Sequence, residues 1–307
     1  MCFLNIKSAL TKARARNDKI IPLNQDTKLV IFSDLHRGVG DWADDFMHNS
    51  LVFTSALDHY FRQDFIYLEL GDGDELYENR RVADIVQAHG NVFQYLNEFH
   101  KNGRLIYIWG NHNKQFGNTK WLERELQRAR THIPDLFLDL VVYETALLGE
   151  KIFLFHGHQG DLMNDLFAFF SRFLVRTFWR PLQTGLGFRD PTSPAKNMRK
   201  RNKVENLILE WARENKMVTI AGHTHRPMFA SLTKQQRQAG EEPEPYYFNS
   251  GSGVHPRCVT CLEIQNMHIE LVKWHTIADS NDERRLKVQR EVLPGCSESL
   301  DNILSQL

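Results

Sequence analysis

The sequence predicts an α/β protein built on a parallel sheet with helices on its faces. Short apolar runs rich in β-branched and aromatic residues alternate with longer segments of helical periodicity in the first half of the chain. Each apolar run ends in polar residues, at the point where a strand would leave the sheet. Ligands bind beyond the carboxyl ends of the strands in such sheets, so these polar residues mark the expected site.

The predicted elements of the first half follow one another in strand–helix order. β-Rich apolar runs predict the strands, and apolar residues at helical spacing predict the helices between them. The expected strands are residues 28–32, 65–70 and 104–109, and the expected helices span about 44–61 and 79–100.

A second sheet is predicted in the second half of the chain. The short strands there follow one another closely, which is typical of antiparallel or mixed pairing. The expected strands are residues 151–155, 217–221, 228–232, 246–249, 257–264 and 268–274. Between them, residues 161–216 are expected to be helical and irregular, and residues 234–245 to form an exposed hairpin loop.

One large domain is predicted at residues 27–275, and the helical segment 161–216 is an insertion within it. A basic extension at residues 1–26 would precede the domain, and a polar tail at residues 276–307 would follow it. The tail is expected to be loosely ordered from about residue 279, because few apolar side chains are available there to pack.

Composition bears on partners and location. Basic and acidic residues both number 38, so no net field favours nucleic acid, and no specific nucleic-acid partner is expected. The sequence lacks an apolar run long enough for a transmembrane helix, an apolar signal-peptide core, and the cysteine content of a disulfide framework. We therefore expect a cytoplasmic protein. The basic segment 7–19 is either a solvated helix or a contact with a membrane surface.

Five polar motifs directly follow apolar strands. An isolated histidine beside glycine is usually a loop residue with an ordinary hydrogen bond, but five such motifs over nearly the whole domain are hard to explain by packing. Residues two apart at a strand end share a face, and neighbouring glycines let the backbone approach a ligand closely. The motifs are Asp34-x-His36, Gly71-Asp72-x-x-Glu75, Gly110-Asn111-His112-Asn113, His156-Gly157-His158 and Gly222-His223-Thr224-His225.

Carboxylate, imidazole and amide donors together suit divalent ions such as Mn, Fe, Zn or Ni. The absence of thiolate among them argues against a structural zinc site. We expect two divalent ions as cofactors, with Mn²⁺ as the first candidate and Fe, Zn or Ni as alternatives.

In these motifs and their order, the chain resembles the calcineurin-like metallophosphoesterase superfamily over about residues 27–275. The resemblance implies a four-layer α/β/β/α sandwich of two mixed sheets flanked by helices, with a helical lid insertion. It implies that one metal is held by Asp34, His36, Asp72 and His225. The other would be held by Asp72, Asn111, His156 and His223, so that Asp72 bridges the pair.

The same resemblance implies the catalytic residues. A hydroxide that bridges the two metals would attack phosphorus. His112 matches the superfamily's catalytic histidine, and Glu75 is expected to orient it. His158 is expected beside the ligands rather than among them. Asn113 stands where the superfamily usually has an acidic residue, which changes local hydrogen bonding but no metal ligand.

The insertion is expected to select the substrate. Residues 172–203 carry nine basic side chains against one acid. Apolar residues between 166 and 174 share one helical face, and Arg172, Arg176 and Arg180 form a stripe beside it. This pattern is typical of a helix packed on the core with a solvated basic face. Alternatively, it is an amphipathic lid that binds an acyl chain or rests on an anionic membrane.

Here the resemblance narrows to the UDP-2,3-diacylglucosamine diphosphatase group. Those enzymes follow their lid with a serine, an asparagine four residues on and a lysine three further, for phosphate contact. Ser193, Asn197 and Lys200 have that spacing. The predicted substrate contacts are Ser193, Asn197, Lys200, His158, Arg172 and Arg176.

The predicted function is hydrolysis of a phosphoanhydride or phosphate ester, on a nucleotide-linked or diphosphate amphiphile such as a UDP-diacylglucosamine. Peripheral membrane contact through the lid would accompany it. The first alternative is a phosphomonoesterase or Ser/Thr protein phosphatase, although an apolar lid argues against protein substrates. A phosphodiesterase or nuclease and a non-enzymatic scaffold are the others; scaffolds usually lose ligands, and here all seven ligand positions are intact.

Overall fold

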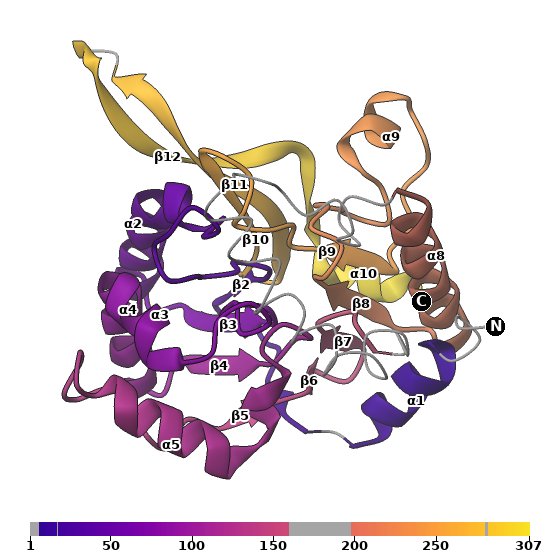
Figure 1. Ribbon diagram of the computed structural model, residues 1–307. Coiled ribbons are helices and arrows are strands. Elements are labelled where there is room, and N and C mark those ends of the chain that lie inside the picture. Colours follow the sequence, from indigo (N-terminus) through magenta and orange to yellow (C-terminus); the bar gives the residue numbers. More distant parts are fainter. Residues whose placement is uncertain (1–5, 17, 160–197, 280–281) are drawn as a thin grey trace.

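The computed structural model describes residues 6–16, 18–159, 198–279 and 282–307, and these residues form four layers (Figure 1). Two mixed β-sheets face each other, and helices cover the outer face of each. The prediction of two mixed sheets flanked by helices is confirmed. Most of the predicted lid insertion, residues 160–197, lies outside the described residues.

The larger sheet has seven strands in the order β12-β11-β10-β2-β3-β4-β5. Four neighbouring strands run parallel: β2 (Leu29–Phe32), β3 (Ile66–Leu70), β4 (Leu105–Ile108) and β5 (Val142–Tyr143). Three antiparallel strands extend the sheet beside β2: β10 (Cys258–Gln265), β11 (His268–Asp279) and β12 (Asp282–Ser299). In Figure 1, β11 and β12 continue past the sheet as a two-stranded ribbon.

The smaller sheet has five strands in the order β1-β6-β7-β8-β9. They are β1 (Ile20–Ile21), β6 (Thr145–Leu148), β7 (Ile152–Phe155), β8 (Val218–Ala221) and β9 (Tyr247–Asn249). Only β6 and β7 pair antiparallel, so the site-bearing strands β7 and β8 run in the same direction.

Helices cover each sheet from outside. On the larger sheet lie α2 (Ser50–Arg62), α3 (Val82–Ala88), α4 (Gly90–Lys101) and α5 (Thr119–Ala129). On the smaller sheet lie α1 (Ile6–Arg16) and α8 (Met198–Asn215). Shorter helices are η1 (Met47–Asn49), η2 (Lys114–Gly117), α9 (Lys234–Gln238) and α10 (Leu300–Ser305). None of the described helices is long and apolar enough to cross a bilayer.

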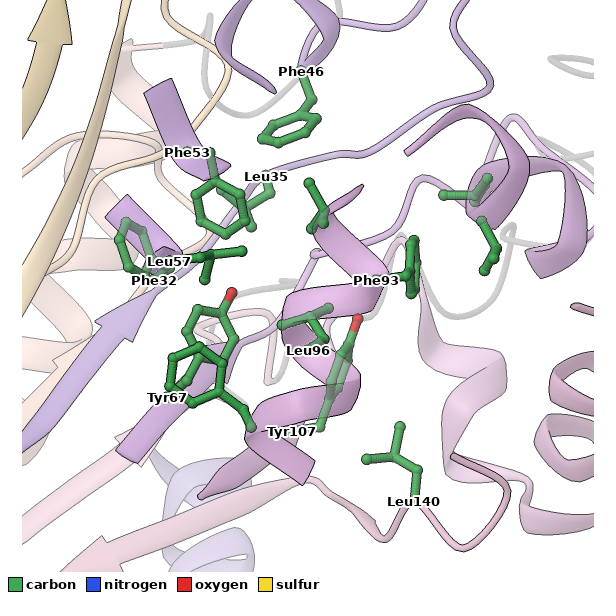
Figure 2. Packing of buried hydrophobic residues seen from close by; sticks show 14 of the residues in the cluster. Phe32, Leu35, Phe46, Phe53, Leu57, Tyr67, Phe93, Leu96, Tyr107 and Leu140 are labelled. Carbon is green, nitrogen blue, oxygen red and sulfur yellow. The ribbon is translucent and has the colours of Figure 1, made fainter. Parts of the chain in front are cut away.

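Strand β2 shows how the sequence builds these layers. Successive side chains of a strand point to opposite faces, so a strand buried on both sides must be apolar throughout. Val30 and Phe32 pack against the helices, as Figure 2 shows for Phe32, Phe53 and Tyr67. Leu29 and Ile31 point the other way, into the core between the two sheets.

Two expectations failed where tertiary contacts decide the local structure. The helix expected over 79–100 is interrupted at His89, whose Nε2 lies 2.7 Å from Asp44 Oδ2 and whose backbone leaves the helical region. The strand expected at 228–232 is only a pair of isolated bridges, because Ala230 and Ser231 have positive φ angles of 48° and 64°. The expected loop at 234–245 contains helix α9.

The expectation of a loosely ordered tail is wrong for residues 282–307. They form β12, which pairs along β11, and α10, which packs between the sheets. The predicted N-terminal extension also joins the fold: Ile6 and Leu10 of α1 are buried against the smaller sheet and α8. The apolar face of the basic segment 7–19 is therefore used in packing within the protein.

Substitution of Leu300 tests how much the C-terminal segment contributes to the free energy of unfolding. Its side chain is fully buried between the sheets, so Leu300→Ala is expected to lower the free energy of unfolding by about 2–5 kcal/mol. Leu286 on the ribbon is 72% exposed and offers the matched control, for which a change within about 0.5 kcal/mol is expected. Urea unfolding of both variants checks this, and equal values would contradict a packed role for α10.

Candidate metal centre

The predicted ligand residues lie at one edge of the two sheets, where the parallel strands end. β2, β3 and β4 of the larger sheet run parallel, and so do β7 and β8 of the smaller one. Their carboxyl ends therefore deliver side chains to the same region. Asp34 and His36 follow β2, Asp72 and Glu75 follow β3, Asn111 and His112 follow β4, His156 follows β7, and His223 and His225 follow β8.

Five of these residues have left-handed backbone conformations, which non-glycine residues seldom adopt. Such a conformation costs roughly 1–2 kcal/mol per residue and persists only where the surroundings impose it. The φ angles are 53° at Asp34, 50° at His36, 51° at Asp72, 66° at His223 and 52° at His225. This concentration of strain on the predicted ligands indicates a functional site.

Backbone hydrogen bonds between the loops hold this conformation. The amide of Asp34 donates to Gly71 O at 3.1 Å, and the amide of His36 donates to Asp72 O at 2.9 Å. On the other sheet, the amide of Gly222 donates to His156 O at 2.9 Å. Hydrogen bonds of the protein's own backbone therefore fix the neighbouring loops to one another.

Glycines permit the close approach of two ligand residues. A Cβ atom on Gly71, whose φ is 86°, would overlap the ring of His156. A Cβ atom on Gly110 would overlap the carboxylate of Asp72. Larger residues at either position would push these donors apart.

Three groups of donors form at this edge of the described structure; one consists of His36, Glu75 and His112, and the other two consist of predicted ligands alone. Asp34, His36 and His225 each offer a donor within 4.8 Å of the others, and so do Asp72, His156 and His223. In the first group, His225 Nε2 lies 3.1 Å from both Asp34 Oδ1 and His36 Nε2. In the second, His156 Nε2 lies 3.0 Å from Asp72 Oδ2.

The two groups adjoin each other. Asp72 Oδ2 lies 4.0 Å from His36 Nε2, and Asp34 Oδ1 lies 4.0 Å from His156 Nε2. Each carboxylate therefore faces a histidine of the other group. A residue that bridges two ions requires such an arrangement, and both Asp34 and Asp72 meet this condition.

Hydrogen bonds on the far side of two rings fix their tautomers. His156 Nδ1 lies 3.0 Å from Leu70 O, which can only accept, so Nδ1 carries the proton. His36 Nδ1 likewise donates to Glu75 Oε2 at 2.7 Å. Both Nε2 atoms thereby face the site, where each could bind a metal ion in place of a proton, as in metal-binding histidines.

The donors fit a cation better than they fit one another. The buried atoms Asp34 Oδ1, Asn111 Oδ1 and His156 Nε2 form no hydrogen bond of ordinary geometry among the described residues, although Asp34 Oδ1 lies 3.1 Å from His225 Nε2 and His156 Nε2 lies 3.0 Å from Asp72 Oδ2. His36 Nε2 and His225 Nε2 lie 3.1 Å apart, within hydrogen-bond distance, so both nitrogens face the same point of the site. Buried polar atoms are normally satisfied, so orphaned oxygen and nitrogen donors that converge indicate a metal site.

Electrostatics at the site follow from burial and from these contacts. Burial disfavours the charged form of Asp34, but His225 and His156 outweigh it and lower the pKa of Asp34 to about 2. Burial also disfavours charge on His156, yet Asp72 and Asp34 raise its pKa to about 9. Burial lowers the pKa of His158 well below its ordinary value, and the neighbouring His156 lowers it further. The site is thus a dense set of carboxylate charges facing imidazoles.

Glu75 contacts both a predicted ligand and the predicted catalytic histidine. Its Oε2 lies 2.7 Å from His36 Nδ1 and 2.7 Å from His112 Nδ1. The contact with His112 was expected, but the contact with His36 was missed, since nothing in the spacing of the motifs requires it. His112 is further tied to the site by its amide, which donates to Asp72 Oδ1 at 2.8 Å.

The remaining site predictions have mixed outcomes. His158 is buried beside His156 and Trp109, with ring centroids 5.4 and 5.0 Å apart. Asn113 Oδ1 accepts a hydrogen bond from the amide of Gly110 at 2.6 Å, and this bond shapes the turn that bears Asn111. The predicted substrate contacts Ser193, Asn197, Arg172 and Arg176 lie outside the described residues, and only the backbone of Lys200, in α8, is described.

Comparisons with known proteins add little. No protein-family model and no curated protein matches the chain. Similar solved structures include Vps29 from Chaetomium thermophilum, with 11% identity and a TM-score of 0.36 over 90% of this chain and 99% of that one. Vacuolar Protein Sorting 29 from Cryptosporidium parvum has 13% identity and a TM-score of 0.33 over 88% and 99%. Likeness at this level supports no conclusion about function.

Proposed function

We propose that this protein is a hydrolase of phosphate esters or phosphoanhydrides that uses two divalent metal ions. The observation that carries the proposal is the pair of adjoining donor groups, built on strained loops at the ends of parallel strands. Buried donors without protein partners support a metal role over a packing role.

Seven side chains would hold the ions. Asp34, His36, Asp72 and His225 would bind one, and Asp72, Asn111, His156 and His223 the other. When bound, such ions supply a water of lowered pKa and positive charge for the phosphoryl oxygens. Mn²⁺ is the first candidate, and Fe, Zn or Ni are compatible with the same donors.

The protein itself would handle the leaving group. Glu75 holds His112 at Nδ1, which leaves Nε2 as the ring atom that meets substrate. Burial disfavours the charged ring, but Glu75 and Asp72 raise the pKa of His112 to about 10, which favours the protonated form. A protonated imidazole can donate a proton to a departing oxygen or bind a phosphoryl oxygen.

The finer proposal concerns the substrate, and its support comes from the sequence. We propose a nucleotide-linked or diphosphate amphiphile, because the sequence between the His156 and His223 motifs combines apolar residues at helical spacing with clustered arginines. Peripheral contact with an anionic membrane would follow from the same segment. A phosphomonoesterase, a phosphodiesterase and a scaffold without turnover are the competing outcomes.

A substrate panel tests both levels of the proposal. The metal-free protein is supplemented with Mn²⁺ and assayed on a phosphomonoester, a phosphodiester, a nucleotide diphosphate sugar and its acylated form. Hydrolysis that requires metal and is fastest on the acylated diphosphate is the expected result. Equal rates with and without acyl chains would overturn the amphiphile, and no hydrolysis with any divalent metal would favour the scaffold.

A further inference from the structure

Behind the candidate metal centre lies a fully buried arginine. Arg37 directly follows the predicted ligand His36, yet its side chain has no exposed surface. Its Nε donates to Asp74 Oδ1 at 2.8 Å, and one terminal nitrogen donates to Glu69 Oε2 at 3.0 Å. The other donates to Tyr107 Oη at 3.1 Å, and the guanidinium lies 5.4 Å from the centroid of the Phe93 ring. We call Arg37, Glu69, Asp74 and Tyr107 the Arg37 cluster.

The Arg37 cluster joins the three strands that carry half of the site. Arg37 follows β2, Glu69 belongs to β3, Asp74 follows β3, and Tyr107 belongs to β4. Tyr107 Oη also donates to Asp74 Oδ2 at 2.6 Å, which closes a ring of contacts among Arg37, Asp74 and Tyr107. These are the strands whose ends deliver the motifs of His36, Asp72 and His112.

Backbone contacts connect the same segments. The amide of Arg37 donates to Gly73 O at 2.9 Å, and the amide of Glu75 donates to Arg37 O at 2.9 Å. Arg37 and Asp74 thus form a parallel bridge that continues the pairing of β2 with β3 past the strand ends. Every residue in this bridge is adjacent in sequence to a predicted ligand or to Glu75.

Space around the Arg37 cluster is limited. A Cβ atom on Gly73 would lie 2.5 Å from Glu69 Oε1 and 2.6 Å from a terminal nitrogen of Arg37. A guanidinium is suited to this role because its planar fork makes several hydrogen bonds of fixed direction. A cluster that is buried, crowded and ring-closed has few alternative arrangements.

We propose that the Arg37 cluster positions the metal-ligand loops, with Arg37 and Tyr107 as positioning residues that touch neither metal nor substrate. It holds His36 in its left-handed conformation and fixes the segment from Asp72 to Glu75 against it. The metal part of this inference rests on the proposed function. The ordering of the loops does not, because every contact that carries it joins two groups of the protein.

Two buried tyrosines provide a matched test. Tyr107 donates to Asp74 and accepts from Arg37, whereas Tyr60 donates to Glu263 and accepts from Trp274 Nε1 at 2.9 Å. Both side chains are fully buried. Tyr107→Phe and Tyr60→Phe therefore remove the same group from the same kind of environment, but only Tyr107 belongs to the Arg37 cluster.

Two measurements are made on both variants. In metal-free protein, amide hydrogen exchange is followed in peptides that cover residues 33–38 and 71–76. Tyr107→Phe is expected to speed amide exchange in both peptides by a factor of about 10. This factor corresponds to the free energy of one lost hydrogen bond to a charged group. Tyr107→Phe is also expected to weaken Mn²⁺ binding about tenfold, because removing a group that supports a metal ligand typically lowers metal affinity by this amount or more. Tyr60→Phe should change neither quantity.

The outcomes separate the two proposals. If Tyr107→Phe lowers thermal stability as Tyr60→Phe does but leaves exchange in both peptides unchanged, the positioning role is overturned. If the wild-type protein binds no Mn²⁺, the proposed function fails, and the exchange comparison still supports or overturns the ordering of the loops. Arg37→Lys repeats the test, with Arg290→Lys as a more exposed control, since Arg290 also bonds two carboxylates, Glu263 and Glu270.

Discussion

Asp72→Ala is expected to reduce metal-dependent hydrolysis by more than about 100-fold, since even the loss of an outer partner of a ligand costs about 10–100-fold in metal affinity or activity. Asp72 is the predicted bridge, and its carboxylate lies among His156, His36 and the amide of His112. Its removal would therefore weaken both proposed metal positions at once. Calorimetric titration with Mn²⁺ and the rate on the best substrate of the panel give the two numbers.

Asp44 offers the control for this prediction. It is also a buried aspartate paired with a histidine, since its Oδ2 lies 2.7 Å from His89 Nε2. Asp44→Ala removes a comparable pair outside the candidate metal centre, so it should lower stability but leave the rate per folded molecule near the wild-type value. An equal loss of activity in both variants would mean that Asp72 acts only through the fold.

The sequence alone predicts those parts of the site that depend on which residues directly follow each strand. Each predicted ligand residue stands within a few positions of an apolar strand, and the topology of parallel strands then brings the strand ends together. The meeting of Asp34, Asp72 and His156 at one edge was therefore predictable before any contact was known. Their left-handed conformations were not, because they arise from hydrogen bonds between loops that are distant in the sequence.

Contacts across the sheet explain what the sequence did not reveal. An arginine after a motif is ordinarily exposed, and Arg37 is buried only because Glu69, Asp74 and Tyr107 arrive from other segments. The break at His89 likewise depends on Asp44. Strand β12 is mostly polar, so its sequence pattern predicted a loosely ordered tail. Pairing with β11 instead satisfies the hydrogen bonds of its backbone.

His112→Asn separates the chemical step from metal binding. The imidazole touches Glu75 and belongs to none of the proposed ligand sets, so Mn²⁺ affinity should stay near the wild-type value. The rate should fall by about 10²–10⁴, the usual contribution of general acid catalysis. If His112 protonates the leaving oxygen, the loss should be much larger for an alkyl phosphate than for a p-nitrophenyl phosphate, whose leaving group needs no proton.

Glu75→Gln is the companion variant, because Glu75 contacts both His112 and His36. Loss of its charge should lower the rate as His112→Asn does, and it should also weaken Mn²⁺ binding through His36. Equal losses for both leaving groups in His112→Asn would mean that the ring binds a phosphoryl oxygen rather than donating a proton. Unchanged Mn²⁺ affinity in Glu75→Gln would mean that its contact with His36 has no part in holding a metal, and that Glu75 acts on His112 alone.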